Sequence, residues 1–214
     1  MYVCVQELIL DHIDCFARYR GLRTEIRSIV AGQRQAQRTA NGVKVRVIQG
    51  PTGVGKTWSI HAAHPGLYVV PTPDKSGGTP WFDGYTGQSV VILDDFSGEI
   101  PLPFMLRLID RYPMQVQCKG GFLNWVPDTV YITSNVPMGD WYQGAANGHM
   151  EALRRRTGDV VIVSNRAEAS AAAAAPVPII ELPEVIVVDA PIDELVEEEP
   201  VPLLARWEGD FTDW

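Results

Sequence analysis

The 214-residue chain is predicted to be an α/β protein built around a phosphate loop, and three features predict this fold. Short runs rich in β-branched residues alternate with segments of helical spacing. One such run, at 43–48, leads directly into the sequence GPTGVGKT at 50–57. A second run, at 90–93, ends in two aspartates. We therefore expect a three-layer domain, in which helices cover both faces of a sheet.

Residues 50–57 fit the phosphate-loop pattern G-x-x-x-x-G-K-[ST]. Glycines adopt positive φ angles freely, which lets successive backbone N–H groups turn inward around a phosphate. Lys56 is expected to contact the β- and γ-phosphates of ATP, and the Thr57 hydroxyl is expected to bind Mg²⁺. A helix that begins at Lys56 would add its positive end to the site. The alternative is a glycine-rich turn of no function, which the flanking strand and helix disfavour. The predicted nucleotide-binding residues are Gly50, Pro51, Thr52, Gly53, Val54, Gly55, Lys56 and Thr57.

Two further polar groups are expected beside the phosphates. Asp94 and Asp95 end the strand at 90–93; Asp94 is expected to hold Mg²⁺, and Asp95 to orient the attacking water. A strand often ends in an acidic turn, but the spacing from Lys56 favours the functional interpretation. Asn135 follows a strand at 129–132, where its amide is expected to position the same water; the simpler alternative is a polar strand end.

The net charge of −8 is unevenly distributed along the chain. Residues 1–166 contain 17 Lys+Arg and 14 Asp+Glu, whereas residues 167–214 contain one Arg and 12 acidic residues. The body can therefore meet a polyanion, and the C-terminal segment repels one. We predict three regions: a helical linker or oligomerisation region at 1–40, the phosphate-loop domain at 41–165, and a disordered Ala/Pro-rich acidic tail at 166–214.

Two basic features are candidate nucleic-acid contacts. The helical N-terminal region carries a series of arginines, for which we favour a solvated face over direct contact: Arg18, Arg20, Arg23, Arg27, Arg34 and Arg38. The segments 114–118 and 122–125 flank Lys119, Gly120 and Gly121, which predicts a β-hairpin with a cation at its tip. A cationic tip is often only a soluble turn; here we favour contact with DNA.

Cysteine content and hydropathy limit the cellular compartments in which the protein is expected. Three cysteines without C-x-x-C spacing indicate reduced thiols in an intracellular protein and no zinc site. No apolar run reaches the roughly 18 residues that span a membrane, and no signal peptide opens the chain. We therefore expect no membrane association.

The order of these motifs resembles the superfamily-3 helicase domain of the replication-associated (Rep) proteins of circovirus-like, circular single-stranded-DNA viruses. The resemblance covers about residues 16–164. The matching pieces, in order, are FARYRGL at 16–22, GPTGVGKT at 50–57, PWFDGYTG at 80–87, VVILDDF at 90–96, MLRLIDRYP at 105–113, KGG at 119–121, VYITSN at 130–135, WY at 141–142 and EALRRR at 151–156.

This resemblance implies an AAA+-like ATPase that hydrolyses Mg²⁺-ATP at the subunit interfaces of a hexameric ring. It implies a sensor role for Asn135, contact of the Lys119 hairpin with single-stranded DNA, and a location in the host nucleus. It also implies a trans-acting arginine at Arg155 or Arg156. Arg154 departs from the family, which has an aromatic or apolar residue at this position. Because the family is similar to helicases of RNA viruses, RNA is the second candidate substrate.

The chain also departs from Rep proteins in its N-terminal part. It lacks the His-x-His or His-x-Gln pair and the Tyr-x-x-Lys nucleophile of the family's nicking domain. We therefore expect a helicase part without the nicking endonuclease, from a split gene, a spliced or truncated product, or a remnant. A separate nicking polypeptide is one candidate partner. Two alternatives to an ATP-driven helicase stay open at this stage. One is an ATP-binding oligomerisation partner of a full-length Rep, and the other is a small-molecule phosphoryl-transferase.

Overall fold

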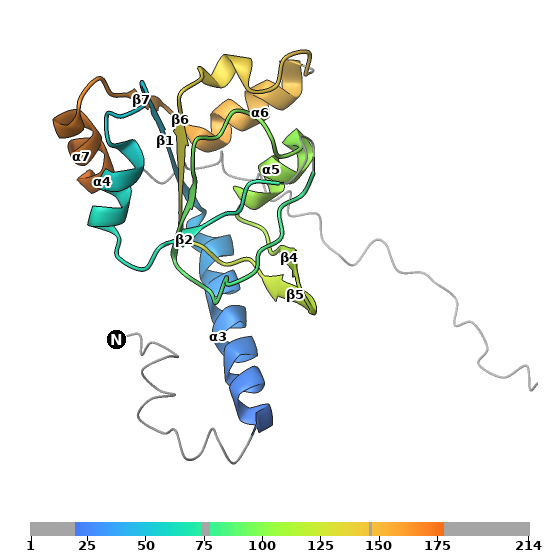
Figure 1. Ribbon diagram of the computed structural model, residues 1–214. Helices are drawn as coiled ribbons and strands as arrows, with labels where there is room; N and C mark the ends of the chain where they lie inside the picture. Colours follow the sequence, from blue (N-terminus) through green and yellow to red (C-terminus); the bar gives the residue numbers. More distant parts are fainter. Residues whose placement is uncertain (1–19, 74–77, 146, 178–214) are drawn as a thin grey trace, which may run out of the picture. The chain divides into compact units, whose positions relative to one another are not determined.

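A computed structural model describes residues 20–73, 78–145 and 147–177, with side chains from Ile29 onward and excepting Asn147. The chain divides into units at Met1–Glu181 and Leu182–Trp214, and all described residues belong to the first. Its centre is a five-stranded sheet in the order β2-β3-β6-β1-β7, in which every pair of neighbours is parallel (Figure 1). The strands are β1 (Lys44–Gln49), β2 (Tyr68–Val69), β3 (Val90–Leu93), β6 (Thr129–Ser134) and β7 (Val160–Ile162). The predicted α/β class is therefore confirmed.

Helices cover both faces of this sheet, because side chains alternate between the faces along each strand. Val45 and Val47 face one core, to which α5 (Leu102–Leu108) and α6 (Asn147–Thr157) contribute. Ile48 faces a second core, which α4 (Lys56–Ala63) and α7 (Arg166–Ala174) complete. Figure 1 shows α4 and α7 together on one side of the sheet and α5 and α6 on the other. This is the expected three-layer arrangement.

Helix α3 (Arg20–Asn41) and the hairpin of β4 (Gln115–Cys118) and β5 (Gly121–Asn124) lie outside these layers. Helix α3 leads into β1 through Gly42, whose φ of 74° turns the chain. The helix continues through Gly21 near its start. Strands β4 and β5 pair antiparallel and form the predicted hairpin. A short 3₁₀ helix, Met138–Asp140, follows β6.

The basic face of α3 is not simply solvated, which corrects the prediction for two of its arginines. Arg38 is only 1% exposed, and its guanidinium donates to the carbonyls of Leu108, Asp110 and Pro127. Arg34 donates to the carbonyl of Gly87 and lies 3.5 Å from the carboxylate of Asp128. Convergent carbonyls at the end of α5 provide the partners that a buried guanidinium requires. The side chains of the other four arginines lie outside the described part.

The boundary that we expected after residue 165 is also wrong, because α7 begins at Arg166 and belongs to the folded domain. Asn165 caps this helix by accepting a hydrogen bond from the Glu168 amide, and Ala169, Ala172 and Ala173 are buried against α4 and the sheet. The alanine run looked like low complexity in the sequence. Alanine is, however, the strongest helix former and small enough for close helix packing. Residues 178–214 of the expected tail lie outside the described part.

Within the described residues, none of the helices combines the length and the hydropathy that a membrane span requires.

Candidate active site

The predicted nucleotide site lies where β1, β3 and β6 end. The register pairs Leu93 with Ile132 and Gln49 with Ser134, so these three strands bring their carboxyl ends to one edge of the sheet. The phosphate loop follows β1, Asp94 and Asp95 follow β3, and Asn135 follows β6. The strand order therefore gathers on one edge the groups that the sequence separates by up to 85 positions. Ligand sites of parallel α/β sheets occur at this edge.

Glycines shape the phosphate loop for two different reasons. Gly53 and Gly55 have φ angles of 87° and 88°, which a residue with a Cβ atom adopts only with strain. Gly50 is required by a close approach instead, because a Cβ atom there would lie 2.2 Å from the carbonyl oxygen of Val163. The loop is thus fixed by its own backbone and by the segment that follows β7.

Lys56 is held inside the loop. It is 4% exposed, and its ammonium donates to the carbonyls of Gly50 and Pro51, at 2.8 and 3.0 Å, and to Oδ1 of Asn135 at 2.7 Å. Burial lowers the pKa of Lys56, while Asp95 and Asp94 oppose this shift. Phosphate oxygens bound in the loop would compete for the same ammonium and restore a full counter-charge to it.

Asp94 and Thr57, which we expected to bind magnesium, lie side by side. Oδ1 of Asp94 accepts hydrogen bonds from the hydroxyls of both Thr57 and Thr133, the latter at 2.7 Å. One hydroxyl and one carboxylate side by side suit Mg²⁺, which keeps most of its remaining ligands as water or substrate phosphate. The residues present therefore fit the ion that we expected.

Asp95 and Asn135 are joined to each other and to Lys56. The amide nitrogen of Asn135 donates to Oδ1 of Asp95 at 3.0 Å, while its oxygen accepts from Lys56. Asp95 has a φ of 48°, and among the described non-glycine residues it alone has a positive φ. Aspartate and asparagine tolerate this left-handed conformation better than other residues do. Local strain of this kind gathers at functional sites, and it turns the exposed Asp95 carboxylate toward Asn135.

Thr133 is a site residue that sequence reasoning missed. It is fully buried, donates to Asp94 and accepts the backbone N–H of Asp95 at 2.9 Å. One hydroxyl thus holds the Asp94 carboxylate and the Asp95 backbone. The register of β6 against β3 puts Thr133 directly beside Asp94. Only the pairing of the two strands points to Thr133, because no single motif contains both residues.

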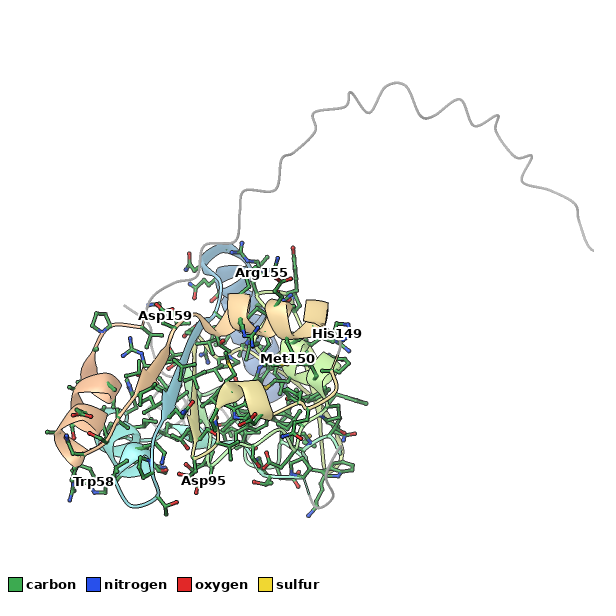
Figure 2. All side chains as sticks on the ribbon, turned by 90° about the horizontal axis from the view of Figure 1, so that it is seen from above. Trp58, Asp95, His149, Met150, Arg155 and Asp159 are labelled. Atoms are coloured by element: carbon green, nitrogen blue, oxygen red, sulfur yellow. The ribbon has the colours of Figure 1, made fainter. Side chains whose placement is uncertain are left out.

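The arginine run at the end of α6 divides by environment. Arg156 is mostly buried, and its Nε and terminal nitrogen donate to Oδ2 of Asp110 at 3.1 and 2.6 Å. Arg154 and Arg155 are exposed. Arg155 lies in the last turn of α6, before β7 begins, whereas Asp95 follows the end of β3; Figure 2 shows the two at opposite ends of the domain. The geometry of one subunit therefore does not bring Arg155 to its own phosphate site.

The β4–β5 hairpin presents Lys119 to solvent. Its side chain is 86% exposed, and the ammonium lies 3.7 Å from the Asp83 carboxylate, which also accepts the Lys119 backbone N–H at 2.7 Å. Gly120 and Gly121 have the positive φ angles that the tight turn needs. Phe122, the next residue, is 70% exposed, which is unusual for phenylalanine and was not anticipated. The tip therefore carries an exposed cation beside an exposed aromatic ring.

Comparison with known proteins agrees with this geometry. A family model described as RNA helicase matches residues 46–136. The replication-associated protein of Porcine circovirus 2 is 38% identical over 163 residues, which cover 75% of this chain and 49% of the relative. That of Porcine circovirus 1 is 40% identical over 140 residues, 64% of this chain and 42% of the relative. That of Beak and feather disease virus is 45% identical over 101 residues, 47% of this chain and 32% of the relative.

The chain thus spans about half or less of the length of these relatives. The residues that the family model matches, 46–136, contain the phosphate loop and the ends of β3 and β6, where Asp94, Asp95 and Asn135 lie. Residues 46–136 are thus similar to an RNA helicase family, and most of the chain is similar to the replication-associated proteins of circoviruses.

Proposed function

We propose that the chain is a Mg²⁺-dependent ATPase that moves along single-stranded nucleic acid during viral DNA replication. The observation that carries this proposal is the connected network of Lys56, Asn135 and Asp95 beside the Asp94–Thr57 pair. In this network the Asn135 amide lies within hydrogen-bond distance of both the Lys56 ammonium and the Asp95 carboxylate. The names of the relatives supply the replication context, and the family model supplies the link to helicases.

The residues divide the chemistry among themselves. Lys56 would neutralise the β- and γ-phosphate oxygens, and Thr57 with Asp94 would hold Mg²⁺, which screens the charge that develops on the phosphates. Asp95 would orient a water molecule for in-line attack and accept its proton. Asn135, which contacts both Lys56 and Asp95, would keep the carboxylate aligned with the γ-phosphate. Because one amide contacts both side chains, nucleotide binding at Lys56 and the alignment of Asp95 would be linked.

Hydrolysis would also need a second cation from a neighbouring subunit. Arg156 is engaged by Asp110, and Arg155 is exposed at the end of the domain opposite Asp95. We assign the trans-acting role to Arg155, because an arginine that acts across an interface must be exposed in the single subunit. Such arginines contribute roughly 10³–10⁵ in rate where they have been measured. This assignment implies a closed ring of subunits, for which six is the number that the resemblance implies.

Steady-state ATP hydrolysis with and without single-stranded DNA tests the proposal. The intact chain should hydrolyse ATP faster when DNA is present, and single-stranded RNA in a parallel reaction decides between the two nucleic acids. Lys56→Ala should lose nucleotide binding, because the buried cation is removed. Asp95→Asn keeps the backbone conformation, so it should bind Mg²⁺-ATP normally and lose most hydrolysis.

Each alternative function predicts a different result. A phosphoryl-transferase would need a small-molecule acceptor and ignore DNA, and an oligomerisation partner would bind ATP without turnover. Equal loss of nucleotide binding in Lys56→Ala and Asp95→Asn would show that the roles given to these two residues are wrong.

A further inference from the structure

Next to the phosphate loop, on the side away from Asp95, lies a stacked pair of side chains for which the hydrolysis chemistry has no use. The guanidinium carbon of Arg166 lies 3.7 Å from the centroid of the Trp58 ring. Trp58 is nevertheless 54% exposed, so the guanidinium covers only part of the indole. An exposed tryptophan two positions after the phosphate-binding lysine requires an explanation, because tryptophan is usually well buried.

Arg166 is fixed against the loop itself. A Cβ atom placed on Gly55 would lie 3.4 Å from Cγ of Arg166, so the aliphatic part of this side chain packs directly on the phosphate loop. Arg166 is the first residue of α7, and the start of that helix is held in place by a reciprocal cap. Asn165 accepts from the amide of Glu168, and the Glu168 carboxylate accepts from the backbone N–H of Ser164 at 2.7 Å. The pair therefore has a defined position at the mouth of the site.

The strand order gives the direction in which a nucleotide would lie. The water-orienting groups come from β3 and β6, on one side of β1, whereas α7 follows β7, on the other side. A triphosphate that points its γ-phosphate toward Asp95 and Asn135 must extend its sugar and base toward β7 and α7. Figure 2 shows Trp58 at the same end of the domain as Asp95, on the side where α4 and α7 lie.

We propose that Trp58, backed by Arg166, is the stacking platform for the base of the bound nucleotide. This inference rests on the proposed function and adds to it the groups that recognise the nucleobase. A flat indole with a guanidinium on one face suits any purine ring, since stacking on an aromatic side chain is tolerant of base identity. The pair offers no hydrogen-bond acceptor for the exocyclic groups of a base, because both ring and guanidinium nitrogens only donate. ATP and GTP should consequently bind with similar affinity.

Binding of two ligands to the full chain, measured by calorimetry, separates the platform from the phosphate loop. ADP contacts both features, whereas inorganic tripolyphosphate contacts the loop alone. Trp58→Ala should weaken ADP binding about tenfold, within the range that base–aromatic stacking contributes, and leave tripolyphosphate binding unchanged. Trp58→Phe retains a stacking ring and should restore most of the ADP affinity. Trp81→Ala removes another tryptophan, 50% exposed, and serves as the matched control with no effect on either ligand.

Three results would overturn the platform. Unchanged ADP affinity in Trp58→Ala would show that the base lies elsewhere. Equal weakening of ADP and tripolyphosphate would show that Trp58 only supports the loop, as would failure of Trp58→Phe to restore binding. If the wild-type chain binds neither ligand, the proposed function itself fails, and the platform with it.

Discussion

Arg46 is the side chain by which the sheet holds the end of α7, and its replacement tests whether this helix belongs to the folded domain. Arg46 lies in the middle of β1 and is 7% exposed. Its guanidinium donates to the carbonyls of Ala172, Ala175 and Pro176, where α7 ends. The last carbonyls of a helix have no partners within it and carry its negative end. A buried guanidinium satisfies these carbonyls and is satisfied by them.

The structure sets the expected magnitude for Arg46→Met. A hydrogen bond to a charged group contributes about 1.5–3 kcal/mol net. Three such bonds are lost, but Ala175 and Pro176 are exposed, so water can replace the guanidinium at their carbonyls. Methionine also fills much of the vacated volume and leaves no buried charge. We therefore expect a loss of about 2 kcal/mol, which lowers Tm by roughly 4–8 °C in a domain of this size.

Thermal unfolding and hydrogen exchange together provide the assay. Arg46→Met should lower Tm and increase exchange at the α7 amides, with little change at the amides of α5. Lys44→Met, on the same strand, is the matched control; Lys44 is half-buried, and its change should cost less than about 0.5 kcal/mol. An unchanged Tm, or a lower Tm with α7 as protected as before, would refute the argument that Arg46 acts through the helix end.

Four further predictions follow from other parts of the structure. Phe122→Ala at the hairpin tip should weaken binding of single-stranded DNA about fivefold or more if bases stack on this ring. Tm should not change, because the side chain is exposed. Equal affinity in the variant would show that the ring does not contact DNA. Arg155→Ala should abolish hydrolysis with Tm preserved, whereas Arg156→Ala should lower Tm because it leaves the Asp110 carboxylate without its ion pair; the opposite pattern would reverse the assignment. A chain that ends after Val177 keeps α7 and should bind DNA more tightly than the full chain at low salt but not at high salt, because the acidic residues after 177 compete with phosphates; no difference at low salt would contradict this. Stability should fall as the pH rises above about 10, since burial raises the pKa of Tyr68 and of Tyr85 to about 12 and the unfolded chain then loses these protons first. Arg38, whose pKa burial lowers to about 10, raises stability over the same pH range and opposes the tyrosines. Tyr85→Phe removes one of the destabilising groups, so the pH midpoint of alkaline unfolding should shift upward. An unshifted midpoint would mean that groups other than Tyr85 cause the loss of stability.

The parts of the site that follow strands were predictable from the sequence, and the reason is geometric. Parallel strands place their carboxyl ends at one edge, so Asp94 after one strand and Asn135 after another were expected to meet near Lys56. In the structure Asn135 accepts a hydrogen bond from Lys56 at 2.7 Å and donates one at 3.0 Å to Asp95, the residue after Asp94. Thr133 was missed because its role depends on the register between two strands, which no local pattern encodes.

The buried arginines were not predictable, because their partners are backbone carbonyls. A sequence shows a charged residue but not the place where carbonyl groups converge, so arginines on a helix are assigned to solvent by default. Arg38 meets carbonyls at the end of α5 and Arg46 meets those at the end of α7, in both cases far along the chain. The same limitation hid α7, whose alanines gain their packing partners only when α4 lies beside them.

The burial of these arginines bears on how the protein would hold nucleic acid. Arg38, Arg46 and Arg156 count toward the basic body of the chain, but the protein itself occupies each guanidinium. Among the described residues, those that remain exposed and basic are few: Arg107, Lys119, Arg154, Arg155 and Arg166. Of these, Arg155 and Arg166 are assigned above to the nucleotide.

One subunit therefore offers a small number of phosphate contacts, and each contact contributes a limited, salt-dependent share of affinity. A ring that places several hairpins on one strand multiplies those contacts without any new chemistry. Affinity for DNA should consequently rise steeply with chain concentration, in parallel with the assembly that Arg155 requires for hydrolysis. Dilution that dissociates the subunits should then remove DNA binding and ATP turnover together, and DNA binding that persists in the isolated subunit would mean that the contacts lie elsewhere.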